Sequence, residues 1–195
     1  MNPHALMHVI YGPFVYAHPD HRTVDGVDLA RVPAGIANQW MIDRYHLDTA
    51  IDFDLQDVPL ARTCIDHWVR LPRIAFLIGV QRLRAALVEH GRYVHLDPSS
   101  QRFLCVPHAA VPKAECTGLP GDDAIIAAGA ACIAAALRDA PRALRQRLPL
   151  LFPRPHAARL AAELDGARDN TCTVCPSTLF SFAVNHALLE PAPVS

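Results

Sequence analysis

A run of 14 uncharged residues, Ala124–Leu137, restricts the folds open to this chain more than any other segment. It consists of alanine, isoleucine, glycine, cysteine and leucine, and the two aspartates before it can cap a helix. Such a helix has almost no polar face and must be covered by protein on every side, yet it is shorter than the roughly 20 residues that cross a bilayer. We therefore predict a central buried helix over 123–138, with neighbouring helices close to it at Gly129.

The rest of the chain has the pattern of a helical protein divided by prolines. Seventeen prolines stand against nine glycines in 195 residues, and aromatic residues make up only 7%, which argues against an all-β sandwich or barrel. A chain of this length needs only one hydrophobic core. We predict an all-α fold, a compact single-domain bundle of about six to eight helices with proline-rich connections. This domain is expected to cover 27–195, after an irregular N-terminal segment over 1–26.

Apolar residues at helical spacing indicate where the individual helices lie. The most regular pattern covers 73–90, with its arginines toward solvent and Gly91 as the stop. Ile36 and Trp40 share one face of an earlier helix, and Leu179 and Phe182 share one face of the last. Further helices are predicted to begin near Pro33 and Pro59 and to cover 97–106, 141–147, 155–164 and 176–189.

Charge and cysteine content narrow the possible partners and compartments. The formal net charge of −1 lacks the basic excess with which proteins neutralise nucleic-acid phosphates. The six cysteines are neither dense nor regularly spaced, which fits a reducing cytoplasm. The first 16 residues contain no lysine or arginine and are interrupted by proline and glycine, unlike a secretory leader. We expect a cytoplasmic protein with no membrane span and no nucleic-acid partner.

Cysteine and histidine offer a possible metal or thiol site. Cys172 and Cys175 have the C-x2-C spacing of zinc knuckles and redox dithiols, and Cys105 with His108 could complete a zinc site. No predicted strand precedes Cys172, as a redox dithiol normally requires, and the second pair lies more than 60 residues upstream. We therefore favour ordinary thiols, and a small zinc-bound or thiol-dependent enzyme stays the alternative.

The remaining residues form no catalytic constellation. The sequence holds no G-x-S-x-G, no phosphate-binding glycine-rich loop and no H-E-x-x-H. His18 and His21 flank Pro19 and Asp20, but proline forces a turn in which the two imidazoles need not converge, so a solvated turn is expected. We predict no enzyme activity, no metal and no cofactor.

Arginines produce the one notable asymmetry of charge. Arg70, Arg73, Arg82 and Arg84 follow one another along the helix predicted over 73–90 and the residues before it. Such a run is usually a solvated helix face, but arginine also binds carboxylates bidentately and is enriched at protein interfaces. We predict that these four arginines contribute to a partner-binding surface.

Two segments and their spacing carry a family pattern. The first is WVRLPRIAFLIG over 68–79, which continues into RLRAAL over 82–87. The second is the small-residue helix over 129–137, followed by Pro141 and by RLPL over 147–150. With a short aromatic and proline segment over 11–18, the pattern covers roughly residues 10–155. In these features the chain resembles the SctK family of bacterial type III secretion systems, whose members include YscK, PscK, OrgA and MxiK.

The resemblance implies a cytoplasmic, non-enzymatic adaptor of the sorting platform beneath the injectisome, held at the inner membrane through protein contacts. In that family the protein links the cytoplasmic domain of the inner-membrane ring protein SctD to the pod protein SctQ, which leads to the stator SctL and the ATPase SctN. We therefore expect SctD-like and SctQ-like partners and no small-molecule substrate. A third possibility is a helical secretion chaperone or regulator; these tend to be acidic, and a net charge of −1 argues against it.

Overall fold

The structure, a computed structural model, describes residues 3–55, 58–107, 118–166 and 176–191. These residues group into two units. Unit 1 holds 3–55, 58–69 and 137–166, and unit 2 holds 70–107, 118–136 and 176–191. The chain passes between the units at η3 (Trp68–Arg70) and at the end of α8 (Asp122–Leu137). The single domain expected over 27–195 stays a prediction.

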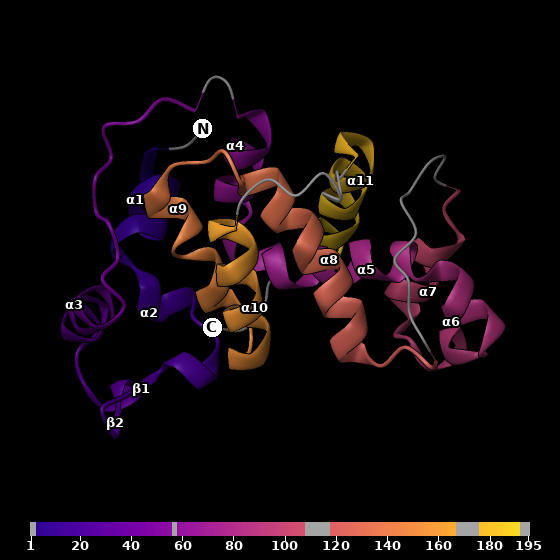
Figure 1. The fold of residues 1–195 in the computed structure, drawn as a ribbon, viewed down its shortest axis with the longest axis horizontal. Helices are drawn as coiled ribbons and strands as arrows, with labels where there is room; N and C mark the ends of the chain where they lie inside the picture. Colours follow the sequence, from indigo (N-terminus) through magenta and orange to yellow (C-terminus); the bar gives the residue numbers. More distant parts are fainter. Residues whose placement is uncertain (1–2, 56–57, 108–117, 167–175, 192–195) are drawn as a thin grey trace. The chain divides into compact units, whose positions relative to one another are not determined.

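Unit 1 is built from short helices and one small hairpin (Figure 1). Its elements in chain order are α1 (Pro3–Tyr11), α2 (Pro13–Tyr16), η1 (Pro19–His21), β1 (Thr23–Val24), β2 (Val27–Asp28), η2 (Leu29–Arg31), α3 (Ala34–Arg44), α4 (Pro59–Asp66), α9 (Arg142–Arg145), η5 (Leu148–Leu151) and α10 (Arg154–Asp165). Proline stands in the first turn of α2, α4 and α10, where its missing N–H has no helical partner to lose. Helix α2 packs against α3, and α10 packs against η5.

The hairpin depends on a two-residue turn. Strands β1 and β2 are antiparallel, with Thr23 opposite Asp28 and Val24 opposite Val27. Between them Asp25 and Gly26 have φ angles of +49° and +81°, as a type I′ turn requires at both positions. A hairpin this short is not stable alone, so it relies on Val24, which is buried in unit 1.

A buried arginine joins three parts of unit 1. Arg147 follows α9 and has no exposed surface. Its guanidinium donates twice to the carbonyl oxygen of Ile10, at 3.1 and 2.7 Å, and also to those of Asp48 and Ala143, at 2.6 and 2.7 Å. Burial lowers the pKa of Arg147, but an arginine stays charged in proteins, so these carbonyl dipoles replace a counter-ion. The end of α1, the loop after α3 and helix α9 are therefore fixed to one side chain.

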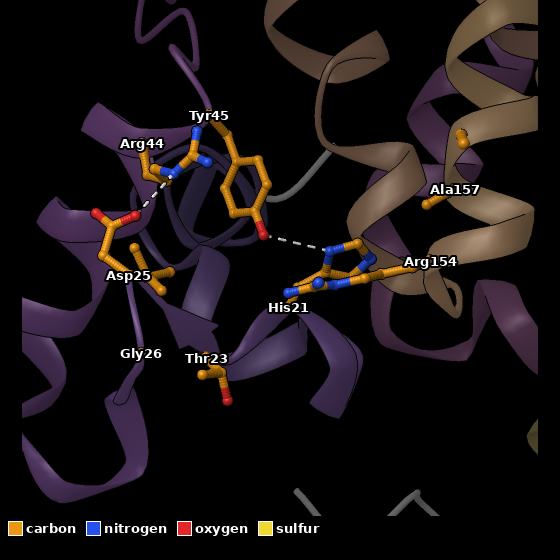
Figure 2. A pocket seen from close by; sticks show the side chains of 10 residues that line it. His21, Thr23, Asp25, Gly26, Arg44, Tyr45, Arg154 and Ala157 are labelled. Atoms are coloured by element: carbon orange, nitrogen blue, oxygen red, sulfur yellow. Dashed lines mark hydrogen bonds and ion pairs between the residues drawn. The ribbon is translucent and has the colours of Figure 1, made fainter.

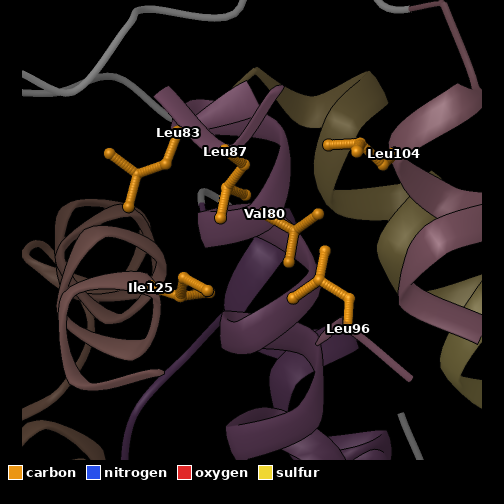
Figure 3. Packing of buried hydrophobic residues seen from close by; sticks show 6 residues of the cluster. All are labelled: Val80, Leu83, Leu87, Leu96, Leu104 and Ile125. Carbon is orange, nitrogen blue, oxygen red and sulfur yellow. The ribbon is translucent and has the colours of Figure 1, made fainter. Parts of the chain in front are cut away.

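Unit 2 is a set of helices around one hydrophobic cluster. Its elements are α5 (Leu71–Arg82), α6 (Arg84–Glu89), η4 (Arg92–His95), α7 (Pro98–Cys105), α8 up to residue 136, and α11 (Ser177–Leu188). Helix α5 packs against both α7 and α11. The cluster draws on α5, α6, α7 and α8 and on the residues that follow α5 and η4 (Figure 3), and it consists of Val80, Leu83, Leu87, Leu96, Leu104 and Ile125.

Helices α5 and α8 touch through their backbones. A Cβ atom added at Gly129 would overlap the carbonyl oxygen of Ala75, and one added at Gly79 would overlap that of Ile125. Both positions accept only glycine, because any other residue pushes the two helices apart. The close approach predicted at Gly129 is confirmed, and Gly79 is its partner on α5.

The predicted all-α fold is confirmed in that helix predominates, but the described residues also contain the β1–β2 hairpin, and the helices are shorter and more numerous than expected. The described residues contain eleven α-helical segments instead of six to eight, and two of these segments have only four residues. The central helix runs over Asp122–Leu137, and α7 begins after the predicted cap Asp97, whose carboxylate accepts from two backbone N–H groups. No helix in the described part of the chain is long and apolar enough to span a bilayer.

Two predicted segments differ from the structure in their secondary structure. The N-terminal segment expected to be irregular contains α1, α2 and η1, because Pro3 and Pro13 stand at helix starts, where proline is tolerated. The helix expected over 73–90 is divided at Leu83, which has φ −98° and ψ 11°. The buried side chain of Leu83 lies in the hydrophobic cluster, so the residue at the break still contributes to the core of unit 2.

Helix α3 buries a different face from the one predicted, and α11 leaves one residue of its predicted buried face exposed. On α3, Ala37 and Met41 are buried while Ile36 is 56% exposed. On α11, Leu179 and Ala183 are buried as predicted and Phe180 is buried as well, while Phe182 is 51% exposed. In both helices the packed neighbours, rather than the largest side chains, decide which face is covered.

Candidate partner-binding surface

Two of the four arginines predicted to bind a partner donate to the backbone of unit 2. Arg70 donates from Nη1 to the carbonyl oxygens of Ala187 and Glu190, at 2.6 and 3.2 Å, at the end of α11. Arg82 is only 7% exposed and donates from Nη1 to the carbonyl oxygen of Ala128 at 2.6 Å. Its expected position toward solvent is wrong because α8 covers this side of α5. Arg70 and Arg82 therefore attach α11 and α8 to α5.

Arg73 binds two carboxylates from distant parts of the chain. Its Nη1 and Nη2 donate to Asp97 at 3.0 and 2.8 Å, and its Nε and Nη2 donate to Glu190 at 2.8 and 2.7 Å. Both contacts are bidentate, the geometry in which guanidinium and carboxylate match best. Since Asp97 caps α7 and Glu190 follows α11, this triad fixes both helices to α5.

The two carboxyls of the triad have depressed pKa values. Burial alone raises the pKa of Asp97 and of Glu190, but hydrogen bonds from Arg73 to both, and from Ser100 to Asp97, outweigh it. Each pKa therefore lies below its ordinary value. A carboxyl with a depressed folded-state pKa stabilises the fold above its unfolded pKa, and that stability is lost as the pH falls through the folded pKa.

This linkage predicts an acid-sensitive unit 2. We expect the unfolding temperature to fall progressively below about pH 5, and to fall less in the double variant Asp97→Asn/Glu190→Gln, which has no carboxyl to protonate at the triad. Asparagine still caps a helix, so α7 keeps its start. Circular dichroism melts between pH 7 and pH 3 measure the slope. The control is Asp122→Asn, which removes a 65% exposed carboxylate 3.2 Å from Arg92 and should keep the wild-type slope. An unchanged slope in the double variant would contradict the prediction.

Arg84 differs from the other three arginines because its side chain is exposed. Val88, one turn along α6, is 53% exposed, and Tyr93 and Val94 in η4 are 42% and 54% exposed. Helices α6 and η4 pack against each other, and we use the term α6–η4 surface for the exposed side chains of these four residues. Exposed arginine, tyrosine and aliphatic side chains are a composition typical of protein interfaces.

The zinc or thiol alternative rests mostly on residues that the structure does not describe. Cys105 is described and exposed at the end of α7, while His108, Cys172 and Cys175 lie outside the described residues. Within the described ranges, no three His, Cys, Asp or Glu residues stand together as a metal site. The alternative therefore stays a prediction.

Unit 1 contains a polar pocket that sequence reasoning missed (Figure 2). The cavity has a volume of about 570 Å³ and lies between the β1–β2 hairpin, the end of α3 and the start of α10. Arg44 and Asp25 stand on one side, with Arg44 Nε 3.5 Å from Asp25 Oδ1, and His21 and Arg154 stand on the other. The Asp25–Gly26 turn signal could have indicated the hairpin, but nothing local places arginines from α3 and α10 beside it.

His21 forms part of the pocket wall and is only 5% exposed. Its Nε2 lies 2.9 Å from the carbonyl oxygen of Phe152, which can only accept, so Nε2 carries the hydrogen. Its Nδ1 then accepts from the hydroxyl of Tyr45 at 3.4 Å. Burial lowers the pKa of His21 more than the Phe152 hydrogen bond raises it, and Arg154 lowers it further. The imidazole is therefore neutral at pH 7. The expected solvated turn is confirmed at Pro19 and Asp20, which are exposed, and is wrong at His21, which the residues after η5 cover.

Comparison with known proteins adds an independent observation over most of the chain. Residues 6–189 match the family model "Bacterial type III secretion apparatus protein (OrgA_MxiK)". The oxygen-regulated invasion protein OrgA of Salmonella typhimurium, in strains 14028s, SL1344 and LT2, is 30% identical over 146 residues, which cover 74% of this chain and 72% of that relative. No solved structure matches. The matched range includes described residues of both units.

Proposed function

The chain belongs to the OrgA/MxiK family of bacterial type III secretion apparatus proteins, and we propose that it acts there as a non-catalytic adaptor. The resemblance to the SctK family is thereby confirmed. In this proposal the protein links the cytoplasmic domain of an SctD-like inner-membrane ring protein to an SctQ-like pod protein. Through the pod protein it is connected to an SctL-like stator and an SctN-like ATPase, at the cytoplasmic face of the inner membrane.

The observation that carries the proposal is the α6–η4 surface. Three apolar side chains there, Val88, Tyr93 and Val94, keep between 42% and 54% of their surface exposed. Apolar area of this kind gains free energy when a partner removes it from water, and Tyr and Arg are the residues that most often dominate binding. Arg84 adds a positive charge that favours a partner with an acidic group at the matching position.

The internal contacts of the other arginines give them a different role in this proposal. Arg70, Arg73 and Arg82 attach α11, α7 and α8 to α5, and α6 follows α5 directly in the chain. They would hold the α6–η4 surface in a defined shape, while Arg84 is the arginine of the four that contacts the partner. Preorganisation of this kind lowers the ordering cost of binding.

Co-purification with both partners tests the proposal. The full chain is expected to capture an SctD-like cytoplasmic domain and an SctQ-like protein from the same organism. The double variant Arg84→Glu/Val88→Asp should weaken capture of one partner about tenfold or more and leave the other unchanged. Val88→Asp removes an apolar contact, and Arg84→Glu reverses the charge at the position of the arginine. Capture of neither partner by folded wild-type protein would contradict the adaptor role.

Two control variants separate binding from folding. Arg142→Glu changes an exposed arginine of α9 in unit 1 and should leave both captures and the melting temperature unchanged. Arg82→Gln removes the buried contact to Ala128 and should lower the melting temperature. If the Arg84→Glu/Val88→Asp variant melts like wild type and still captures both partners, the α6–η4 surface is not the interface.

A further inference from the structure

We propose that the polar pocket of unit 1 binds an acidic peptide segment, with a carboxylate side chain held between Arg44 and Arg154. The pocket shares no residue with the α6–η4 surface, and the inference does not depend on which apparatus proteins the chain contacts. Its volume of about 570 Å³ lies within the range of about 300–1,000 Å³ that is usual for ligand sites.

Both guanidinium groups keep hydrogen-bond donors for a ligand. In the described part of the chain, Arg44 has one carboxylate contact, from Nε to Asp25 at 3.5 Å, and its side chain is 57% exposed. Arg154 uses its Nε to donate to the backbone oxygen of Asp20 at 2.9 Å, and its two Nη atoms have no partner among the described residues. Both side chains line the cavity, so each has N–H groups from which a carboxylate bound there can accept.

The charges around the cavity favour a single negative charge. Two guanidinium groups and one carboxylate, that of Asp25, line the cavity, and the imidazole of His21 is neutral, so the lining residues carry an excess of one positive charge. The carboxylate of Asp20 lies outside the lining, where its Oδ2 accepts from the backbone N–H of Arg154 at 3.2 Å. One carboxylate neutralises that excess. A phosphate dianion brings two negative charges close to Asp25, and like charges repel. The balance therefore favours a carboxylate over a phosphate.

The other groups of the pocket suit a peptide. The hydroxyl of Tyr45 donates its hydrogen to His21, so its oxygen is left as an acceptor, which matches a backbone N–H of a bound segment. Ala157 and Ala158 on α10 add methyl groups to the wall beside Arg154. A ligand with a carboxylate, an N–H donor and methylene groups satisfies all three features, and a peptide that contains glutamate or aspartate has them together.

The test uses the full chain, labelled with ¹⁵N, and a capped peptide with the sequence Ala-Glu-Leu-Glu-Ala as the probe. We expect the peptide to shift the amide signals of Thr23, Gly26 and Ala157 in a saturable way. The peptide with both glutamates changed to glutamine should bind about tenfold more weakly or worse, because it loses charge-assisted hydrogen bonds. Inorganic phosphate, titrated in parallel, should bind more weakly than the acidic peptide.

Matched arginine variants locate the binding. Arg44→Gln and Arg154→Gln are each expected to weaken binding of the acidic peptide about tenfold. Arg159→Gln removes an arginine of α10 outside the pocket, one that pairs with Glu163 at 3.3 Å, and should leave binding unchanged. Equal binding of the acidic and the glutamine peptide, tighter binding of phosphate, no saturable shift, or equal losses in all three folded variants would each overturn the proposal. Failure of co-purification with the apparatus proteins would leave this result unaffected.

Discussion

Replacing Gly129 by alanine is expected to lower the free energy of unfolding by about 3 kcal/mol, although alanine is the better helix former. The added methyl group would overlap the carbonyl oxygen of Ala75 on α5. Neither helix can yield locally, because the atom it meets belongs to the backbone. Helices α5 and α8 must therefore separate, and the cluster that joins Val80 to Ile125 loses its packing.

Denaturant unfolding of the purified variant measures this loss. Gly35→Ala is the matched control, since a Cβ atom at that position of α3 meets nothing within 4 Å. The same substitution should be neutral there or stabilise the protein by up to about 1 kcal/mol. Gly79→Ala should destabilise like Gly129→Ala, because its methyl group would overlap the carbonyl oxygen of Ile125. Equal stability of the Gly129→Ala and Gly35→Ala variants would show that the two helices do not pack this closely.

The second large effect is expected from Arg147→Met, which should lower the free energy of unfolding by about 3–5 kcal/mol. Methionine replaces the arginine side chain as far as the position of Nε and keeps the apolar packing of that part, but it lacks the rest of the guanidinium and donates no hydrogen bond. The carbonyl oxygens of Ile10, Asp48 and Ala143 lose the guanidinium donors that they contact at 2.6 to 3.1 Å. A buried acceptor without a donor carries the full cost of its desolvation.

Two further variants show whether the several N–H donors of the Arg147 guanidinium or its positive charge stabilises unit 1. Arg147→Lys keeps the charge but has a single nitrogen, which cannot reach three carbonyls in the geometry of the guanidinium, so an intermediate loss is expected. Arg142→Met, five residues earlier on the exposed side of α9, should change stability by less than about 0.5 kcal/mol. If Arg147→Met is as stable as Arg142→Met by denaturant unfolding, Arg147 does not hold unit 1 together.

Local sequence patterns were sufficient to predict several elements, because neighbouring residues in the chain alone cause these elements to form. The central helix and the cap at Asp97 follow from neighbouring residues alone, and α8 and α7 lie where the pattern predicts them. The break at Leu83, the buried face of α3 and the exposure of Phe182 on α11 were not predictable in this way. Each depends on which element packs alongside, and the helical periodicity of one segment does not contain that information.

Sequence patterns were also insufficient to predict which groups the arginines of the candidate sites contact. Their spacing along 70–84 predicted one basic surface, but Arg73 meets carboxylates 24 and 117 residues away in the chain, and Arg82 meets the backbone of α8. Only Arg84 remains exposed among the four in the described structure. The pocket of unit 1 escaped sequence reasoning for the same reason, since Arg44 and Arg154 come from elements far apart in the chain.

By itself, the amino-acid sequence determined that the chain is mostly helical, where its central helix lies, and to which family it belongs. All three depend on residue order and periodicity, which exist before any long-range contact forms. Only the tertiary structure decided which arginines are internal ties, which one faces solvent, and which two meet across a cavity. A guanidinium is polar wherever it occurs, and its partner, a carbonyl, a carboxylate or water, is set by the elements that fold next to it.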